Sequence, residues 1–276
     1  MNRRTFLRRG GVLAAGTLLY GTTIEPQWTE YVHRSLPIEH LPPALMGKTL
    51  LQISDTHVGE RVSSRFLRTE FRRSAALDPD FVVYTGDHVD RGTDKQLAEF
   101  ARLLEVAPRG RLGTVAILGN HDYGHKFRDG GAAERVAERL RAAGITVLRN
   151  EQTTVAGLTI TGLDDRWGTN YAPGPALAAT DPAAANLVLC HNPDACDDGA
   201  ELWGGYRGWI LAGHTHGGQC RLPGFGPPIL PVRNPAYAAG RVDLGDGRLL
   251  YVNRALGHSH RIRFGVRPEV TVFTLA

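Results

Sequence analysis

Hydrophobic residues recur in short blocks along the chain, and each block is followed by a polar loop. Five apolar runs predict strands: 50–53, 81–84, 114–118, 187–189 and 208–211. Stretches with helical spacing come after the first three: 64–77, 95–104 and 132–143. Strands that alternate with helices are typical of an α/β sheet, whose ligands bind beyond the carboxyl ends of the strands.

The pattern changes between residues 145 and 162 and again after residue 240, where short β runs occur without helices. These runs include 159–161, 249–252 and 270–273. We expect them to form a second sheet packed face to face on the first, with helices outside. The predicted fold is therefore a four-layer α/β/β/α sandwich.

The first 47 residues differ from the rest. Residues 2–8, Asn-Arg-Arg-Thr-Phe-Leu-Arg, resemble a twin-arginine export signal. The uncharged stretch 10–24 would span roughly 22 Å as a helix, short of the ~30 Å hydrocarbon core, so we interpret 1–24 as a signal. Because no clean Ala-x-Ala site follows, an uncleaved N-terminal anchor stays open. Residues 25–47 are polar and rich in proline and predict a linker to a domain at 48–276.

Composition and charge narrow the class of protein. The chain has 276 residues, of which 42% are hydrophobic and only three are Cys, which excludes disordered, collagen-like and disulfide-framework proteins. The net charge of +4 equals the charge of four arginines in the first nine residues, and no acidic residue precedes Glu25. The remaining chain is neutral, so its charge gives no reason to expect a nucleic-acid partner.

Polar residues with metal-binding chemistry follow all five predicted strands. They are Asp55, His57, Asp87, Asn120, His191, His214 and His216. Carboxylates and imidazoles without thiolates suit divalent ions such as Mn²⁺, Fe²⁺ or Zn²⁺. Seven candidates exceed the need of one tetrahedral ion, and two ions ~3.5–4 Å apart are a standard arrangement for phosphoester hydrolysis. The sequence therefore predicts a dinuclear site.

In this order the motifs resemble the calcineurin-like metallophosphoesterase superfamily over roughly residues 48–275. The matching motifs are Asp55-x-His57, Gly86-Asp87, Gly119-Asn120-His121-Asp122, His191 and Gly213-His214-Thr215-His216. Residues 213–219 and the tail 262–269 resemble the membrane-associated bacterial branch. The resemblance implies the metallo-dependent phosphatase fold, with two mixed sheets.

The resemblance also implies a role for each matched position. Asp55, His57 and His216 would hold one ion, Asp87 would bridge, and Asn120, His191 and His214 would hold the other. A metal-bridging hydroxide would be the nucleophile. His121 would protonate the leaving alkoxide or donate to a phosphoryl oxygen, and Asp122 would orient His121.

Three weaker substrate-binding candidates are His88, Asp165 and Arg166. His88 is alternatively a core imidazole, and Asp165 and Arg166 alternatively belong to an ordinary loop ion pair. Trp167, Tyr171 and residues 173–175 predict a packed surface loop, or alternatively an apolar lip for an acyl chain.

The expected activity is hydrolysis of a phosphodiester, or else of a phosphomonoester, with a phospholipid or envelope-derived substrate. Expected partners are the twin-arginine translocase and a membrane surface, without an obligate protein partner. The expected location is the periplasm or the outer face of the cytoplasmic membrane. One alternative is a UDP-2,3-diacylglucosamine pyrophosphatase of lipid A synthesis, and another is a non-catalytic metal-binding envelope protein.

Overall fold

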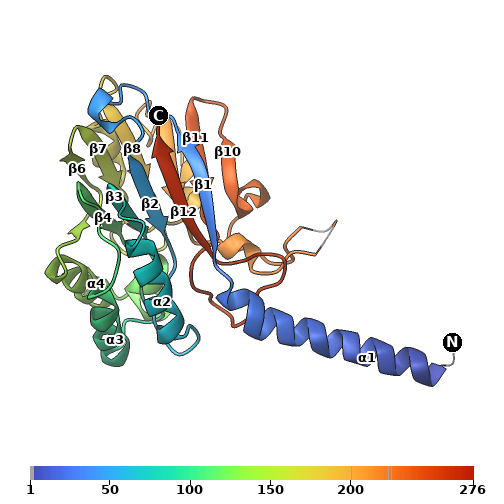
Figure 1. The fold of residues 1–276 in the computed structure, drawn as a ribbon. Helices are drawn as coiled ribbons and strands as arrows, with labels where there is room; N and C mark the ends of the chain where they lie inside the picture. The colour runs from blue at the N-terminus through green and yellow to red at the C-terminus, as the bar shows by residue number, and fades with distance from the viewer. Residues whose placement is uncertain (1–2, 200, 223, 225) are drawn as a thin grey trace.

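Two six-stranded mixed sheets face each other in the computed structural model, which describes residues 3–199, 201–222, 224 and 226–276 (Figure 1). The first sheet has the order β1 (Glu30–Leu36), β12 (Glu269–Leu275), β2 (Thr49–Ile53), β3 (Phe81–Thr85), β4 (Gly113–Ile117) and β5 (Thr146–Val147). Its neighbouring strands are parallel except for β12 and β2.

The second sheet has the order β10 (Gly240–Asp243), β11 (Arg248–Val252), β9 (Gly208–Ala212), β8 (Ala185–Leu189), β7 (Leu158–Gly162) and β6 (Glu151–Val155). Its four central strands are parallel, and the two edge strands β10 and β6 run antiparallel to their neighbours.

Helices α2 (Ser64–Ala75), α3 (Asp94–Leu104) and α4 (Gly130–Ala142) cover the outer face of the first sheet. Each begins at a capping side chain: Ser63, Thr93 and Asp129 accept from backbone N–H groups of the first turn. Their apolar faces pack against one face of the strands, whose other face meets the second sheet. Adjacent residues of β2 show this alternation, since Leu51 lies under the helices and Leu50 lies between the sheets.

The fourth layer is built mostly from turns. The outer face of the second sheet, with Val188 and Ile210, is covered by Trp203, Tyr206 and Tyr237 and by the five-residue helix α5 (Gly174–Ala178). The predicted fold class is confirmed, with short turns in place of long helices on this face.

Three of the predicted strands lie in a different sheet from the one expected. The run 270–273, expected in the second sheet, lies in β12 of the first sheet, beside β2. The runs 187–189 and 208–211 lie in β8 and β9 of the second sheet. The five metal-binding loops therefore come from both sheets rather than from one.

Residues 25–47, expected to be a linker, are packed into the domain. They contain β1, which pairs with β12, and Leu36 and Leu45 are buried. Glu25 is buried as well, and its carboxylate accepts the backbone N–H groups of Gly265 (3.0 Å) and Val266 (2.6 Å).

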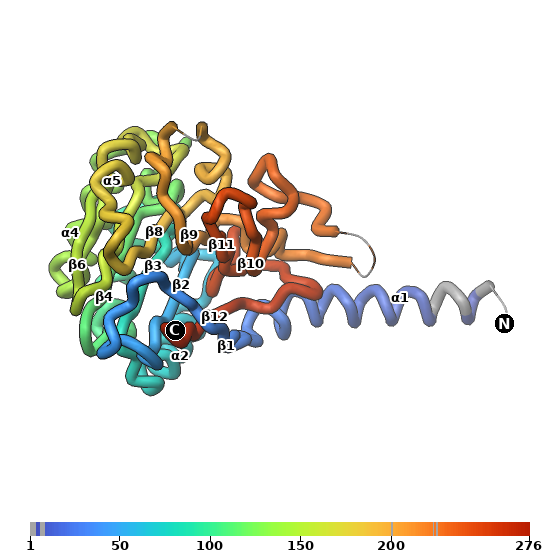
Figure 2. Tube along the Cα trace, turned by 90° about the horizontal axis from the view of Figure 1, so that it is seen from above, coloured from blue at the N-terminus to red at the C-terminus, as the bar shows by residue number. Residues whose placement is uncertain are grey.

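Helix α1 (Arg3–Leu19) projects away from the sandwich (Figures 1 and 2). Its side chains Val12, Leu13, Leu18 and Leu19 are exposed. A π-helical turn (Tyr20–Ile24) and a 3-10 turn (Glu25–Gln27) connect it to the domain. Across the described part of the chain, no helix combines the length and apolar character needed to cross a membrane. Residues 1 and 2 of the predicted signal lie outside the described residues.

Candidate active site

The seven predicted ligands lie where the carboxyl ends of strands from both sheets meet. Asp55 and His57 follow β2, Asp87 follows β3 and Asn120 follows β4 of the first sheet; His191 follows β8, and His214 and His216 follow β9, of the second. All seven are buried, with exposed fractions of 5% or less.

Unusual backbone angles direct these side chains inward. Five of the seven have φ between 45° and 71°, in the left-handed region: Asp55, His57, Asp87, His214 and His216. This conformation costs a non-glycine residue about 1–2 kcal/mol, so the surrounding packing must enforce it. Gly119 completes the close approach, because a Cβ there would lie 2.3 Å from Asp87 Oδ1.

Asp55, His57 and His216 form a first cluster, whose potential ligand atoms lie within 4.8 Å of one another. The Nε2 atoms of His57 and His216 are 3.0 Å apart, and His216 Nε2 is 3.3 Å from Asp55 Oδ1. The Asp55 carboxylate also accepts the backbone N–H of His214 and the hydroxyl of Ser54. Two imidazole nitrogens that face each other beside a carboxylate are a suitable donor set for a divalent ion.

Asp87, His191 and His214 form a second cluster. Asp87 Oδ2 lies 3.2 Å from His191 Nε2 and 3.5 Å from His57 Nε2, so one carboxylate oxygen lies between the two clusters. The other oxygen, Oδ1, accepts the backbone N–H of His121 at 2.8 Å. Asn120 joins this cluster, since its Oδ1 is 3.2 Å from His191 Nε2.

Hydrogen bonds outside the clusters fix the orientation of two imidazoles. His191 Nδ1 lies 2.7 Å from the carbonyl of Thr85, and His214 Nε2 lies 3.1 Å from the carbonyl of Pro231. A ring nitrogen that donates to a carbonyl leaves the opposite nitrogen free to bind a metal. His191 therefore presents Nε2 and His214 presents Nδ1 to the centre.

The charges of the site fit divalent cations. Asp55 and Asp87 are buried, and none of the ion pairs among the described residues joins either carboxylate to Lys or Arg. Buried carboxylates require compensation by positive charge. Burial lowers the pKa of His214 to about 3 and of His216 to about 4, which leaves both imidazoles neutral and able to bind a metal. The residues present therefore fit two divalent ions.

His121 lies at the edge of the clusters, with its ring centroid 4.6 Å from that of His57. Its Nδ1 is 2.9 Å from the carbonyl oxygen of Asp90 and 3.5 Å from a carboxylate oxygen of the same residue. Burial lowers the pKa of His121, but the nearby carboxylates of Asp87 and Asp90 outweigh it and raise the pKa to about 9. The Asp90 contact was missed in the sequence, although Asp90 belongs to the loop of Asp87.

The expected hydrogen bond from Asp122 to His121 is replaced by a different arrangement. The Asp122 carboxylate accepts the backbone N–H groups of His88 (2.9 Å), Val89 (3.1 Å) and Gly119 (2.9 Å). The 3-10 turn Asn120–Tyr123 points the side chain back toward its own N-terminus. Asp122 thus holds two ligand loops together, and Asp90 is the residue in contact with His121.

The three weaker candidates lie outside the cavity over the site. His88 is buried with its ring beside Tyr84 and Phe100, and its Nε2 is 2.9 Å from the carbonyl of Ile117. Asp165 is buried, and its Oδ1 accepts the backbone N–H of Trp167 at 2.8 Å. Arg166 forms a two-pronged ion pair with Asp198, at 2.6 and 2.7 Å.

A cavity of about 670 Å³ opens over the two clusters. Five of the predicted site residues line it: Asp87, Asn120, His121, His214 and His216. These five form the floor of the cavity, and Asp55, His57 and His191 do not line it. The remaining lining comes from residues in the segments 124–127, 218–220, 228–231 and 259–262, together with Arg61, Asp90, Arg91, Trp167 and Thr215.

In comparisons with known proteins, the chain is similar to a phosphoesterase family and to proteins named as phosphoesterases or a pyrophosphatase. The sequence model of the calcineurin-like phosphoesterase family matches residues 48–218. The chain is 31% identical to the Bacillus subtilis protein "Uncharacterized metallophosphoesterase YkuE", over all of this chain and 98% of that protein. It is 31% identical to Escherichia coli "Phosphodiesterase YaeI", over 100% and 99% of the two chains. It is 28% identical to "UDP-2,3-diacylglucosamine pyrophosphatase LpxG" of Chlamydia trachomatis, over 94% and 93%.

Proposed function

We propose, since this chain belongs to the calcineurin-like phosphoesterase family, that it cleaves phosphodiester bonds at the two clusters beneath the cavity. The chain is a hydrolase acting on phosphoester bonds, and its family uses divalent metal ions. The proposal adds the preferred bond, the residue roles and the setting in which the enzyme works.

Asp55, His57 and His216 would hold one ion, and His191, His214 and Asn120 would hold the other, with Asp87 shared between them. When bound, the two metal ions would polarise the phosphoryl group as Lewis acids and activate a water molecule. Asp55 and Asp87 contribute the negative charge of the centre, and their backbone hydrogen bonds keep each carboxylate in one orientation.

His121 would act on the leaving group. Its imidazole lies beside the clusters and lines the cavity, so it can donate a proton to the departing alkoxide. Asp90 is the positioning residue, because its carbonyl and carboxylate both face Nδ1 and leave Nε2 directed to the substrate. An alkoxide is a poor leaving group and gains most from a positioned acid. Similarity to the relative named a phosphodiesterase favours a diester as the source of that alkoxide.

The position of Asp87 Oδ2, 3.5 Å from His57 and 3.2 Å from His191, is the observation on which the proposal rests. The test uses purified full-length protein stripped with a chelator and reloaded with Mn²⁺, Fe²⁺ or Zn²⁺. We expect bis-p-nitrophenyl phosphate to be hydrolysed faster than p-nitrophenyl phosphate, and only after reloading. Protein that binds two ions and hydrolyses neither ester would contradict the proposal.

The setting would be outside the cytoplasm, with residues 1–24 as a twin-arginine signal or retained anchor. The Arg-Arg-x-Phe-Leu sequence and the exposed apolar side chains of α1 support this setting. Residues 1–45 fused to a reporter that is active only after export test it. A Lys pair in place of Arg3 and Arg4 should abolish the reporter signal, and equal signals from both fusions would exclude twin-arginine export.

The substrate would be a phospholipid or another envelope-derived diester. Similarity to LpxG favours a second candidate, UDP-2,3-diacylglucosamine, whose pyrophosphate bond the named relative cleaves. That nucleotide-linked precursor lies on the cytoplasmic side, so export and this substrate are mutually exclusive. Parallel assays with UDP-2,3-diacylglucosamine and a phospholipid diester, beside the reporter fusion, separate the two.

A further inference from the structure

We propose that the cavity selects phosphodiesters that carry an extended apolar ester group, and that Phe127, Trp167 and Ile229 determine this specificity. The inference rests on the proposed function, since it concerns the substrate of the same site. Its evidence is separate: it comes from the walls of the cavity and not from the metal-binding floor.

The first wall is a pair of stacked aromatic rings. Phe127 and Trp167 come from different loops, and their centroids lie 5.7 Å apart with an interplanar angle of 26°. The Phe127 centroid is 5.1 Å from that of His121, and the Trp167 centroid is 4.7 Å from that of His214. The wall therefore runs from the proposed acid to a proposed metal ligand.

The local backbone structure determines where each aromatic residue is placed. Lys126 and Phe127 are consecutive residues with φ of 56° and 60°, a conformation that side chains rarely adopt. Trp167 is fixed through its backbone N–H, which donates to the buried carboxylate of Asp165. This explains the position of Asp165, predicted as a substrate contact: it shapes the loop that presents Trp167.

The second wall is aliphatic. Ile229 and Ile262 line it together with Pro228 and Pro231. Ile229 is 79% exposed, so a large apolar side chain faces the solvent of the cavity. The wall is tied to the metal centre, because the Pro231 carbonyl is 3.1 Å from His214 Nε2.

Hydrolysis of a phosphodiester explains the metal-binding residues on the floor of the cavity, but it does not explain the apolar side chains on the walls. Apolar side chains that line a cavity open to solvent gain free energy when an apolar group displaces water from them. The cationic residues do not favour a polyanion instead: of the three Lys and Arg side chains that line the cavity, Arg61 and Arg91 both lie near Asp90, at 3.5 and 3.8 Å. A substrate with one phosphodiester and one long apolar arm fits both surfaces.

The test is a series of alkyl p-nitrophenyl phosphates with methyl, butyl and octyl groups, assayed below their critical micelle concentrations with metal-loaded full-length protein. All three share the phosphodiester and the leaving group. Each buried methylene can raise kcat/KM by up to about fourfold. We expect kcat/KM for the octyl ester to exceed that for the methyl ester by at least about tenfold.

Variants then locate the effect. Ile229→Ser and Trp167→Ala should each reduce the octyl-to-methyl ratio of kcat/KM by about threefold or more. Leu222→Ser is the matched control, because Leu222 is also a large apolar residue, 53% exposed on the same loop, but does not line the cavity. This control should keep the wild-type ratio.

Each outcome has a distinct meaning. Equal kcat/KM along the series, or a preference for the methyl ester, overturns the apolar specificity and leaves the phosphodiesterase intact. A rising series whose ratio is unchanged in Ile229→Ser and Trp167→Ala overturns the assignment to these walls. Failure to hydrolyse any ester with two ions bound overturns the proposed function itself.

Discussion

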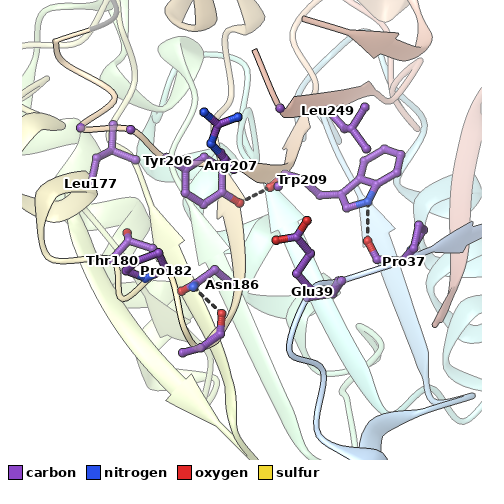
Figure 3. A pocket seen from close by; sticks show the side chains of 16 residues that line it. Pro37, Glu39, Leu177, Thr180, Pro182, Asn186, Tyr206, Arg207, Trp209 and Leu249 are labelled. Carbon is purple, nitrogen blue, oxygen red and sulfur yellow. Dashed lines mark hydrogen bonds between the residues drawn. The ribbon is translucent and has the colours of Figure 1, made fainter. Parts of the chain in front are cut away.

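The second sheet has a hollow at each end, and the two are built differently. At the carboxyl ends of its strands lies the cavity of about 670 Å³ over the Asp and His clusters. At the amino ends of β8, β9 and β11 lies a pocket of about 270 Å³ (Figure 3). There Tyr206 and Trp209 donate to backbone carbonyls, of Trp209 at 2.8 Å and of Pro37 at 2.7 Å.

The difference lies in where the polar atoms point. In the small pocket three polar side chains labelled in Figure 3, those of Asn186, Tyr206 and Trp209, donate to backbone carbonyls; Asn186 donates to those of Asp181 and Ala184. In the large cavity the potential ligand atoms of each cluster lie within 4.8 Å of one another. Five of the residues that carry ligand atoms have left-handed backbone angles. Convergent side chains held at a conformational cost distinguish a reaction site from a hollow that packing leaves behind.

The largest effect should come from removing the shared carboxylate charge. Asp87→Asn loses the oxygen that faces both clusters, so turnover should be abolished, a loss of at least about 10⁴-fold in kcat or roughly 5.5 kcal/mol of transition-state stabilisation. Turnover of bis-p-nitrophenyl phosphate and metal content per chain measure it, and we expect fewer than two ions.

Glu39→Gln provides the control, because it neutralises a carboxylate that lines the small pocket. It should leave kcat and metal content at wild-type values. If the two substitutions lowered turnover equally, the contrast between the hollows would be lost.

The next effect separates chemistry from metal binding within the large cavity. His121→Ala removes a side chain that contacts the clusters without belonging to the seven ligands, so kcat for a dialkyl phosphodiester, whose alkoxide leaving group needs the acid, should fall by about 10²- to 10⁴-fold. Metal analysis of the same preparation should still give two ions per chain. Loss of metal in His121→Ala would show that this imidazole is a ligand and not the acid.

A smaller effect distinguishes Asp90 from Asp122. Asp90→Asn removes the charge beside His121 Nδ1 but leaves the carbonyl contact, so kcat should fall about 10- to 100-fold with little change in Tm. Asp122→Asn cannot accept the three backbone N–H groups as the carboxylate does, so its Tm should fall. A fall in kcat for Asp122→Asn at unchanged Tm would restore the orienting role expected from sequence.

Asp90 and Asp122 also show which features of the site can be predicted from the sequence and which cannot. The strand ends and the polar loops follow from local periodicity, and the alternation that puts Leu50 and Leu51 on opposite faces is local too. The direction of the Asp122 side chain depends on the 3-10 turn that contains it, which adjacency to His121 does not reveal.

The pairing of strands that lie far apart in the chain also cannot be predicted from local sequence patterns. The assignment of β12 to the first sheet and the presence of β1 in the expected linker depend on the pairing of residues 30–36 with 269–275, more than 230 positions apart. No local pattern marks such a partner. The Phe127–Trp167 wall depends on two separate loops for the same reason.

The smallest effect tests the small pocket by itself. Tyr206→Phe deletes the hydroxyl that donates to the Trp209 carbonyl while it keeps the buried ring, so the free energy of unfolding should fall by about 1 kcal/mol. Urea denaturation measures this loss. The value of kcat/KM for bis-p-nitrophenyl phosphate should stay at the wild-type value, because Tyr206 precedes β9 and His214 follows its other end. A drop in kcat/KM without a loss of stability would mean that the small pocket communicates with the metal-binding loops, and the two hollows would then have to be treated as parts of one site.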